Sequence, residues 1–196
     1  IAIVGHGGFA REIACRFNVS DYNFFINMNS INDDNRFQVN DLESIDISKY
    51  DVMVAVGDPV IRKKIIQNLP LDTEYLTYID EKSLILDKHT VKIGDGCILT
   101  AGSILTTNVK LGNFSHINLN TTIGHDTIIG EYCTTTPGVN ISGDCVIGKN
   151  VYFGTGSSIR NGVNICDDVV IGMNCVVTKD LTESGVYVGI PAKKIS

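Results

Sequence analysis

From Ile123 to Val176 the sequence, divided into groups of six residues, reads IGHDTI IGEYCT TTPGVN ISGDCV IGKNVY FGTGSS IRNGVN ICDDVV IGMNCV. All of these groups except the third begin with an apolar residue, and the same period continues on both sides of the stretch. The first positions of the fifteen groups are Ile93, Leu99, Leu105, Leu111, Ile117, Ile123, Ile129, Thr135, Ile141, Ile147, Phe153, Ile159, Ile165, Ile171 and Val177. A helix repeats every 3.6 residues and a strand every two, so neither element explains a period of six.

The fifth position of each group follows a second pattern, because all of these residues but the last are small or β-branched. They are Cys97, Ser103, Val109, Ser115, Thr121, Thr127, Cys133, Val139, Cys145, Val151, Ser157, Val163, Val169, Cys175 and Leu181. A triangular coil of three short strands and three turns fits both patterns, with the aliphatic residue inside and the small residue at the corner. We therefore predict a left-handed parallel β-helix of five 18-residue coils over residues of about 84 to 182.

Cysteine spacing supports the same interpretation. Cys97, Cys133, Cys145 and Cys175 are separated by multiples of six residues, and the chain has no CxxC pair. This spacing places the four thiols at one phase of the repeat, where a small buried side chain is needed. We expect buried structural thiols rather than disulfides or a zinc site.

The first part of the chain lacks the six-residue period. Short apolar runs typical of strands alternate there with segments that have helical spacing of apolar residues. The expected strands are Ile1–Val4, Phe24–Ile26, Asp51–Val56 and Leu76–Ile79, and the expected helices are Arg11–Phe17 and Pro59–Leu69. This alternation predicts a small α/β, Rossmann-like domain with a parallel sheet. We place this domain at residues 1–80 and the β-helix with its C-terminal tail at residues 81–196.

The net charge and the lengths of the apolar runs argue against a nucleic-acid-binding protein and against a membrane-spanning one. The net charge is −6, whereas nucleic-acid-binding proteins usually carry a basic face. Residues 1–80 carry 7 basic and 12 acidic side chains, so most of this negative charge lies in the first domain. No apolar run approaches the roughly 20 residues that a membrane-spanning helix needs. We expect a cytoplasmic protein with neither a nucleic-acid nor a membrane partner.

Two stretches are candidates for chemistry. Gly5-His6-Gly7-Gly8 follows a strand and precedes a helix, the setting in which a glycine turn cradles a phosphate or ribose, although it departs from GxGxxG. The alternative is a glycine turn that only closes the sheet.

His125 lies on a predicted turn beside Asp126, and Gly143 lies one coil further on. Acyl transfer needs a general base, and a carboxylate beside the base and a backbone N–H one coil away would assist it. The spacing alone fits a solvated histidine on a turn equally well.

Some trimeric β-helices bind zinc through three histidines, and this chain has four histidines. His116 and His125 are half a coil apart, and His89 lies two coils from His125. Zinc–nitrogen bonds of about 2.1 Å cannot span such separations within one chain. We expect no metal.

The whole pattern resembles the bacterial sugar acetyltransferases of the sialic acid O-acetyltransferase family, whose best-understood members N-acetylate UDP-4-amino-4,6-dideoxy sugars. The resemblance rests on the glycine turn, Tyr50–Gly57, Ile61–Ile65, Asn118, Ile123–Asp126, Ile129–Tyr132, Ile147–Asn150 and Gly189–Lys193. The sequence departs from the family at Phe9, Asn27, Thr134 and Asp58–Pro59. Most of these departures fall in the nucleotide site, so the identity of the nucleotide does not carry over.

The resemblance implies a role for each matched residue. His125 would be the catalytic base, Asp126 would increase its basicity, and the backbone at Gly143 would face the acetyl thioester. Acetyl-CoA would lie in a groove between neighbouring prisms of a homotrimer, along Thr134, Gly143, Thr155, Gly172 and Met173. We add Pro191, Lys193 and Lys194 to this cofactor site. The nucleotide-sugar would contact Gly7, Gly8, Phe9, Asn27, Gly57 and Asn118.

The residue patterns and the resemblance together predict an acetyl-CoA-dependent N-acetyltransferase that acts on a nucleotide-linked aminosugar. The resemblance implies that this sugar is a UDP- or related NDP-4-amino-4,6-dideoxyhexose. One alternative is O-acetylation of a free sugar such as sialic acid, and the retained nucleotide-like domain weighs mildly against it. The other is a non-catalytic nucleotide-sugar sensor or assembly protein. The intact pair of His125 and Asp126 weighs against that alternative.

Overall fold

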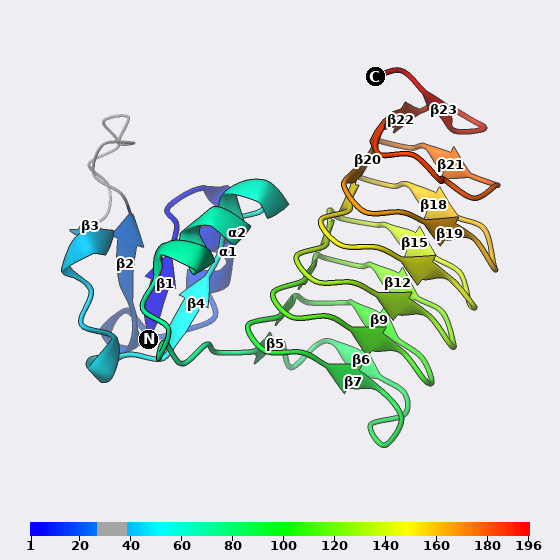
Figure 1. Ribbon diagram of the computed structural model, residues 1–196. Coiled ribbons are helices and arrows are strands. Elements are labelled where there is room, and N and C mark those ends of the chain that lie inside the picture. The colour runs from blue at the N-terminus through cyan, green and yellow to red at the C-terminus, as the bar shows by residue number, and fades with distance from the viewer. Residues whose placement is uncertain (27–38) are drawn as a thin grey trace. The chain divides into compact units, whose positions relative to one another are not determined.

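The computed structural model describes residues 1–26 and 39–196 (Figure 1). Contacts between Cα atoms divide these residues into two compact units, Ile1–Leu76 and Thr77–Ser196. Each unit has its own apolar core. They are described in turn.

The first unit is a Rossmann-like α/β fold around a four-stranded parallel sheet. Its strands are β1 (Ala2–Val4), β2 (Asn23–Ile26), β3 (Val39–Asp41) and β4 (Val52–Val54), and their order in the sheet is β3-β2-β1-β4. Its helices are α1 (Gly8–Ala14), α2 (Pro59–Asn68) and the short 3₁₀ turns Val19–Asp21, Leu42–Ser44 and Ile47–Lys49. Strands β2 and β3 lie on one side of β1 and β4 lies on the other, so a topological switch point lies between β1 and β4. Ligands of open α/β sheets bind at such a point.

Local sequence signals explain where the two helices begin and end. Asp58 caps α2, since its Oδ1 accepts hydrogen bonds from the N–H groups of Val60 and Ile61 at 2.9 Å, and Pro59 occupies the first turn as expected. The first helix differs from the expected Arg11–Phe17, because it begins at Gly8 and ends at Ala14. Beyond Ala14 the N–H groups of Arg16 and Phe17 bond three residues back, so the chain continues only as tight turns.

One expected strand lies in a different sheet from the one that the sequence predicts. Leu76–Ile79 was expected to complete the first sheet, but only Tyr75 bridges to Val52, whereas Tyr78–Ile79 (β5) pairs with Ile98–Leu99 (β8) in the β-helix. The partners in that pair are 20 residues apart instead of 18. Because the turn between Ile85 and Lys92 holds two additional residues, the hexapeptide phase is lost before Ile93, and the sequence pattern could not follow the β-helix back to its first strand.

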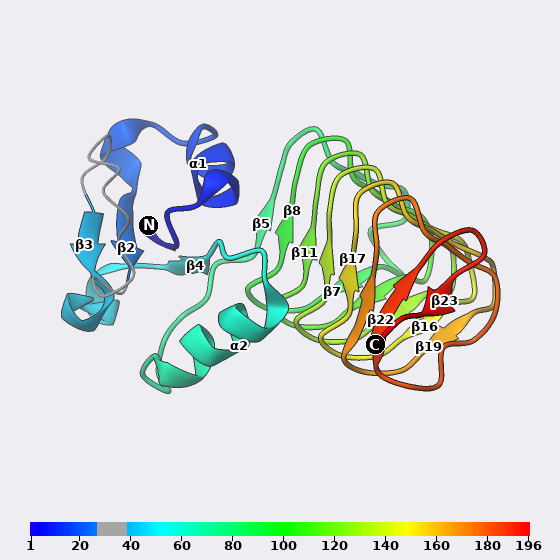
Figure 2. The ribbon, with the colours of Figure 1, turned by 90° about the horizontal axis from the view of Figure 1, so that it is seen from above.

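The second unit is a left-handed parallel β-helix with three faces, as predicted (Figures 1 and 2). The first face holds β5, β8, β11 (His116–Ile117), β14 (Thr134–Thr135), β17 (Tyr152–Phe153), β20 (Val169–Ile171), β22 (Gly185–Val188) and β23 (Lys193–Lys194). The second face holds β6 (Leu84–Ile85), β9 (Ile104–Leu105), β12 (Thr122–Ile123), β15 (Asn140–Ile141), β18 (Ser158–Ile159) and β21 (Val176–Val177). The third face holds β7 (Lys92–Ile93), β10 (Lys110–Leu111), β13 (Ile128–Ile129), β16 (Val146–Ile147) and β19 (Asn164–Ile165).

Turns join these faces at three corners, and two of the corners matter for the site. The first corner is formed by the turns that lead from the first face to the second, and the second corner by those that lead from the second face to the third. All strand pairs in the unit are parallel except β22 with β23, where the C-terminal tail folds back against the last coil. The tail therefore covers one end of the prism.

The interior of the β-helix is a single column of side chains from the first position of each group. Ile123, Phe153 and Ile171 are fully buried, and Ile147 is 2% exposed. Cys97, Cys133, Cys145 and Cys175 are also fully buried and carry free thiols, which confirms the expectation from their spacing. Burial raises the pKa of the Cys145 and Cys175 thiols, so both are less ready to ionise than an exposed cysteine.

Among the described residues, no helix is both long enough and apolar enough to cross a bilayer. The longest helix, α2, spans only Pro59–Asn68.

Replacing Ile147 by Asp should unfold the β-helix, because an unpaired carboxylate would be enclosed within the apolar column. We expect the melting temperature, followed by circular dichroism, to fall by about 10 °C or more, the scale of a loss of several kcal/mol. Val146→Asp is the matched control, since Val146 lies next to Ile147 on the same strand but is 48% exposed. Equal melting temperatures for the two variants would contradict the inward orientation of Ile147.

Candidate acyl-transfer site

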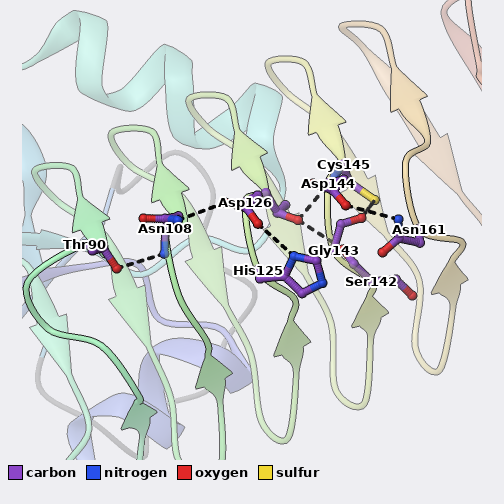
Figure 3. Close-up of polar contacts among 10 residues, drawn as sticks. Thr90, Asn108, His125, Asp126, Ser142, Gly143, Asp144, Cys145 and Asn161 are labelled. Carbon is purple, nitrogen blue, oxygen red and sulfur yellow. Dashed lines mark hydrogen bonds and ion pairs between the residues drawn. The ribbon is translucent and has the colours of Figure 1, made fainter.

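His125 lies on the second corner, in the turn between β12 and β13 (Figure 3). Its backbone is held from the adjacent coil, because its carbonyl oxygen accepts a hydrogen bond of 2.8 Å from the N–H of Asp144. Its side chain is 55% exposed. The fold therefore fixes the backbone of this histidine and leaves its imidazole accessible.

Asp126 sets the orientation of the ring. His125 Nδ1 lies 2.8 Å from Asp126 Oδ2, and Asp126 Oδ1 accepts a hydrogen bond of 2.9 Å from Asn108 Nδ2. These two hydrogen bonds, the one from His125 first, hold the pKa of the Asp126 carboxyl below its ordinary value. An ionised carboxylate can only accept, so the ring proton lies on Nδ1 and Nε2 keeps its lone pair. The pair thus presents a base at Nε2.

Gly143 makes room for this imidazole. A Cβ atom built at position 143 would lie 2.5 Å from His125 Nε2 and 2.6 Å from Cε1, closer than non-bonded atoms approach. The space beside Gly143 is therefore occupied by the ring of His125 and is not an open channel. The N–H of Gly143 donates no hydrogen bond to residues 1–26 and 39–196, although Gly143 itself is buried.

The 18-residue period continues the second corner beyond Gly143 to two side chains that the sequence analysis did not single out, Asn161 and Lys179. With its side-chain amide turned, Asn161 donates to the carbonyl oxygen of Gly143 at 3.1 Å. Lys179 lines a small cavity with Thr178, Pro191 and Lys193. Counting in steps of 18 from His125 would have found both residues.

The expected CoA residues divide between two corners. Thr155, Gly172 and Met173 lie on the first corner, in the turns that follow β17 and β20, whereas His125 and Gly143 lie on the second. Asn118 also lies on the first corner, after β11, and Thr134 is buried within β14. One β-helix therefore does not bring these residues together with His125.

The two tail lysines differ in their surroundings. Lys194 Nζ forms a 2.9 Å ion pair with Glu183 Oε2, which raises the pKa of this lysine. Lys193 is exposed and forms no ion pair with any residue that the structure describes. Lys193 rather than Lys194 is thus the cation that is available to an anionic ligand, and Pro191 lies beside it in the same cavity.

The fold requires glycine at only one of the four glycine positions of the first unit. Gly5 has φ +119°, and a Cβ there would lie 2.8 Å from the carbonyl oxygen of Ala55, so the fold itself requires this glycine. Gly7, Gly8 and Gly57 would place a Cβ in open space, and packing does not require them. These three follow β1 and β4, on the two sides of the switch point.

The expected nucleotide site includes two further residues of the first unit, Phe9 and Asn27. Phe9 lies in α1 and is partly buried. Asn27 lies outside the described residues.

One group on the second corner has the composition of a metal site. His125, Asp126 and Asp144 each place a ligand atom within 4.8 Å of the others, and all three are exposed. This group has one histidine, whereas the zinc site of other β-helices has three. Because His125 Nδ1 already bonds directly to Asp126 and exposed carboxylates often cluster without an ion, we assign no metal here.

Family comparisons match both units of the chain. Residues 1–69 match the PglD N-terminal domain. Residues 144–179 match the bacterial transferase hexapeptide (six repeats), and residues 90–107 and 120–152 match the hexapeptide repeat of succinyl-transferase.

One curated relative matches half of the chain, and two solved structures match nearly all of it. A GDP-perosamine N-acetyltransferase of Escherichia coli O157:H7 is 34% identical over 100 residues, which cover 50% of this chain and 44%, less than half, of that protein. The solved structure of WeeI from Acinetobacter baumannii AYE is 29% identical, with a TM-score of 0.87 over 99% of this chain and 98% of that one. The acetyltransferase domain of PglB from Neisseria gonorrhoeae FA1090, solved in complex with acetyl coenzyme A, is 24% identical with a TM-score of 0.85 over 99% and 98% of the two chains, which shows a shared fold.

Replacing Gly143 by Ala should displace the imidazole of His125, because the new methyl group and the ring cannot share the same space. The backbone of Gly143 does not have a positive φ, so alanine is tolerated by the chain itself. We expect a changed ring position in a crystal structure, or changed ring signals in NMR spectra, with the melting temperature lowered by only a few degrees. An unmoved ring in the folded variant would contradict the contact.

Proposed function

We propose that this chain, whose first part matches a PglD N-terminal domain and whose second part matches hexapeptide repeats, is a sugar acetyltransferase of the PglD type. It would transfer the acetyl group of acetyl-CoA to the amino group of a nucleotide-linked aminosugar. The observation that carries the proposal is the 2.8 Å contact between His125 Nδ1 and Asp126, which leaves a base at Nε2 beside Gly143. The named E. coli relative supports a nucleotide-linked aminosugar as the acceptor.

The proposed reaction is a direct attack. The sugar amine adds to the thioester carbonyl carbon and passes a proton to His125 Nε2, which requires a base within hydrogen-bond reach. The carbonyl oxygen becomes an oxyanion, and the candidate donor for it is the N–H of Gly143, which is buried beside His125 and bonded to no described residue. The C–S bond then breaks, and the proton on Nε2 neutralises the departing thiolate of CoA. Amide and thiol are the products.

No acetyl-enzyme is needed for this sequence of steps. The thiols of Cys145 and Cys175 are enclosed in the prism and their pKa values are raised by burial, so neither offers a ready thiolate. Direct attack by the amine is therefore the simpler route.

The acceptor would be held through its nucleotide by the first unit. Gly7, Gly8 and Gly57 leave open backbone around the switch point between β1 and β4, where a nucleoside diphosphate can approach closely. The sugar would be a 4-amino-4,6-dideoxyhexose, as the family resemblance implies. Phe9 and Asp58–Pro59, where the sequence departs from the family, lie in the same region and would decide which base is accepted.

The cofactor would lie between two chains. The CoA residues on the first corner and the base on the second belong to different edges of one prism, so a complete site requires the first corner of a neighbouring chain. We infer a homotrimer with three such clefts. Lys193 and Lys179, which share a cavity, would supply positive charge to the phosphates of CoA.

The test of the acceptor is an acetyl-CoA consumption assay. UDP-, GDP- and dTDP-linked 4-amino-4,6-dideoxy sugars would be compared with free sialic acid and with the matching 4-hydroxy nucleotide sugars. We expect turnover with at least one nucleotide-linked aminosugar and none with its 4-hydroxy counterpart. Turnover with sialic acid alone would overturn the proposal in favour of O-acetylation, and no turnover with any acceptor would favour a non-catalytic role.

His125→Ala should lower kcat by roughly 10²-fold or more, the usual effect of losing a general base, while the protein stays folded. Asp126→Asn should have a smaller effect, because an amide can still bond to Nδ1 but no longer fixes the position of the proton. Steady-state kinetics with saturating acetyl-CoA would measure both. Near-normal turnover by His125→Ala would eliminate this mechanism.

The trimer predicts a mass of about 64 kDa in solution, three times the chain mass of 21.3 kDa. Light scattering coupled to size-exclusion chromatography at micromolar concentration would measure it. A monomer would contradict both the trimer and a cofactor site that needs two chains.

A further inference from the structure

A ladder of hydrogen bonds reaches the proposed base from two coils away along the second corner (Figure 3). Thr90 Oγ1 donates to Asp87 Oδ2 at 2.7 Å and accepts from the backbone N–H of Asn108 at 2.9 Å. Asn108 Nδ2 then donates to Asp126 Oδ1 at 2.9 Å, and Asp126 Oδ2 contacts His125 Nδ1 at 2.8 Å. Thr90, Asn108 and Asp126 are 18 residues apart in turn, so each lies one coil further along the prism.

This ladder places one hydrogen bond on each oxygen of the Asp126 carboxylate. The side chain of Asp126 is 47% exposed, so packing alone does not hold it. With only the contact to His125, the carboxylate could rotate about its Cβ–Cγ bond and carry the ring with it. A second bond on the other oxygen fixes the plane of the carboxylate and, through it, the plane of the imidazole.

Asn108 is itself held in place. Its φ is +54°, a left-handed conformation that asparagine adopts more readily than most residues, and its N–H is bonded to Thr90. The side-chain amide must present its nitrogen to Asp126, because an ionised carboxylate accepts and does not donate.

We propose that Asn108 is a positioning residue for acetyl transfer, which holds Asp126 so that His125 keeps its proton on Nδ1 and its lone pair on Nε2. Asn108 would touch neither substrate nor cofactor and would act only through Asp126. The lowered pKa of Asp126, to which the bond from Asn108 contributes after that from His125, agrees with this arrangement.

The same prism contains a matched pair without a histidine. Asn150 Nδ2 donates to Asp168 Oδ1 at 2.9 Å, the two residues are again 18 apart, and both have positive φ, as Asn108 and Asp126 do. The residue before Asp168 is Asp167 rather than a histidine. A purely structural role for stacked asparagine and aspartate would therefore give the two pairs equal effects.

The experiment compares Asn108→Gly with Asn150→Gly in the full chain. Glycine accepts positive φ and keeps the backbone N–H, so only the side-chain donor is lost. We expect Asn108→Gly to lower kcat by about 3- to 10-fold, the scale of one lost hydrogen bond to a charged group, with the KM for acetyl-CoA unchanged. Asn150→Gly should leave kcat unchanged, and melting temperatures should shift alike in both variants.

A second pair of variants, Asn108→Asp and Asn150→Asp, changes the charge at constant size. An aspartate at position 108 would face Asp126 as a like charge, so one of the two carboxyls would keep its proton to higher pH. We expect the acid limb of the kcat/KM profile to move to higher pH in Asn108→Asp and to stay in place in Asn150→Asp. An unmoved acid limb in Asn108→Asp would contradict the contact between position 108 and Asp126 on which the positioning role depends.

The kinetic readouts rest on the proposed function, but the tautomer of His125 does not. Nitrogen-15 NMR of the imidazole, assigned with His125→Ala, should show one tautomer protonated at Nδ1 in the wild-type protein and a mixture in Asn108→Gly. An unchanged tautomer, or equal kinetic effects of the two glycine variants, would overturn the positioning role. Absence of acetyl transfer in the wild-type protein would instead refute the proposed function, and the NMR comparison would still decide the role of Asn108.

Discussion

Backbone hydrogen bonds between successive coils of the β-helix fix the length of each coil, and the rest of the second unit depends on this register. The N–H of Gly124 bonds to the carbonyl of Ile141, and the N–H of Asp144 bonds to that of His125, each at 2.8 Å. A residue inserted into a strand would turn every following side chain to the other side of the sheet. Additional residues are therefore tolerated only in a turn, as between Ile85 and Lys92.

The same register explains why chemistry can be placed at a corner. Corner positions such as Asn108, Asp126 and Asp144 have φ between +54° and +60°, a region that asparagine and aspartate tolerate better than most residues. The residue types that suit the backbone there also carry short side chains with oxygen and nitrogen atoms. Stacked one coil apart, they form ladders along an edge, and at the second corner such a ladder ends at His125. The rigid scaffold thus supplies the precision that an exposed turn would lack.

In the first unit the main constraint is the close contact between the turn after β1 and the chain that follows β4. Gly5 is fixed by contact with Ala55, whereas Gly7, Gly8 and Gly57 face open space. A turn needed only to close the sheet would require Gly5 alone. The open glycines therefore favour a bound ligand over the purely structural interpretation that the sequence left available.

The sequence by itself determined the β-helix, the burial of its thiols and the positions of the catalytic candidates on turns, because a strict six-residue period translates directly into place within the prism. It also placed His125, Asp126 and Gly143 on one corner. Only the tertiary structure decided that Tyr78–Ile79 belongs to the β-helix, since the longer turn hid the period there. It also decided that the imidazole fills the space beside Gly143, that Lys194 is paired while Lys193 is not, and that Asn108 supports Asp126. These facts depend on the rotamers and distances of side chains one coil apart, which a repeat in sequence brings near one another but does not orient.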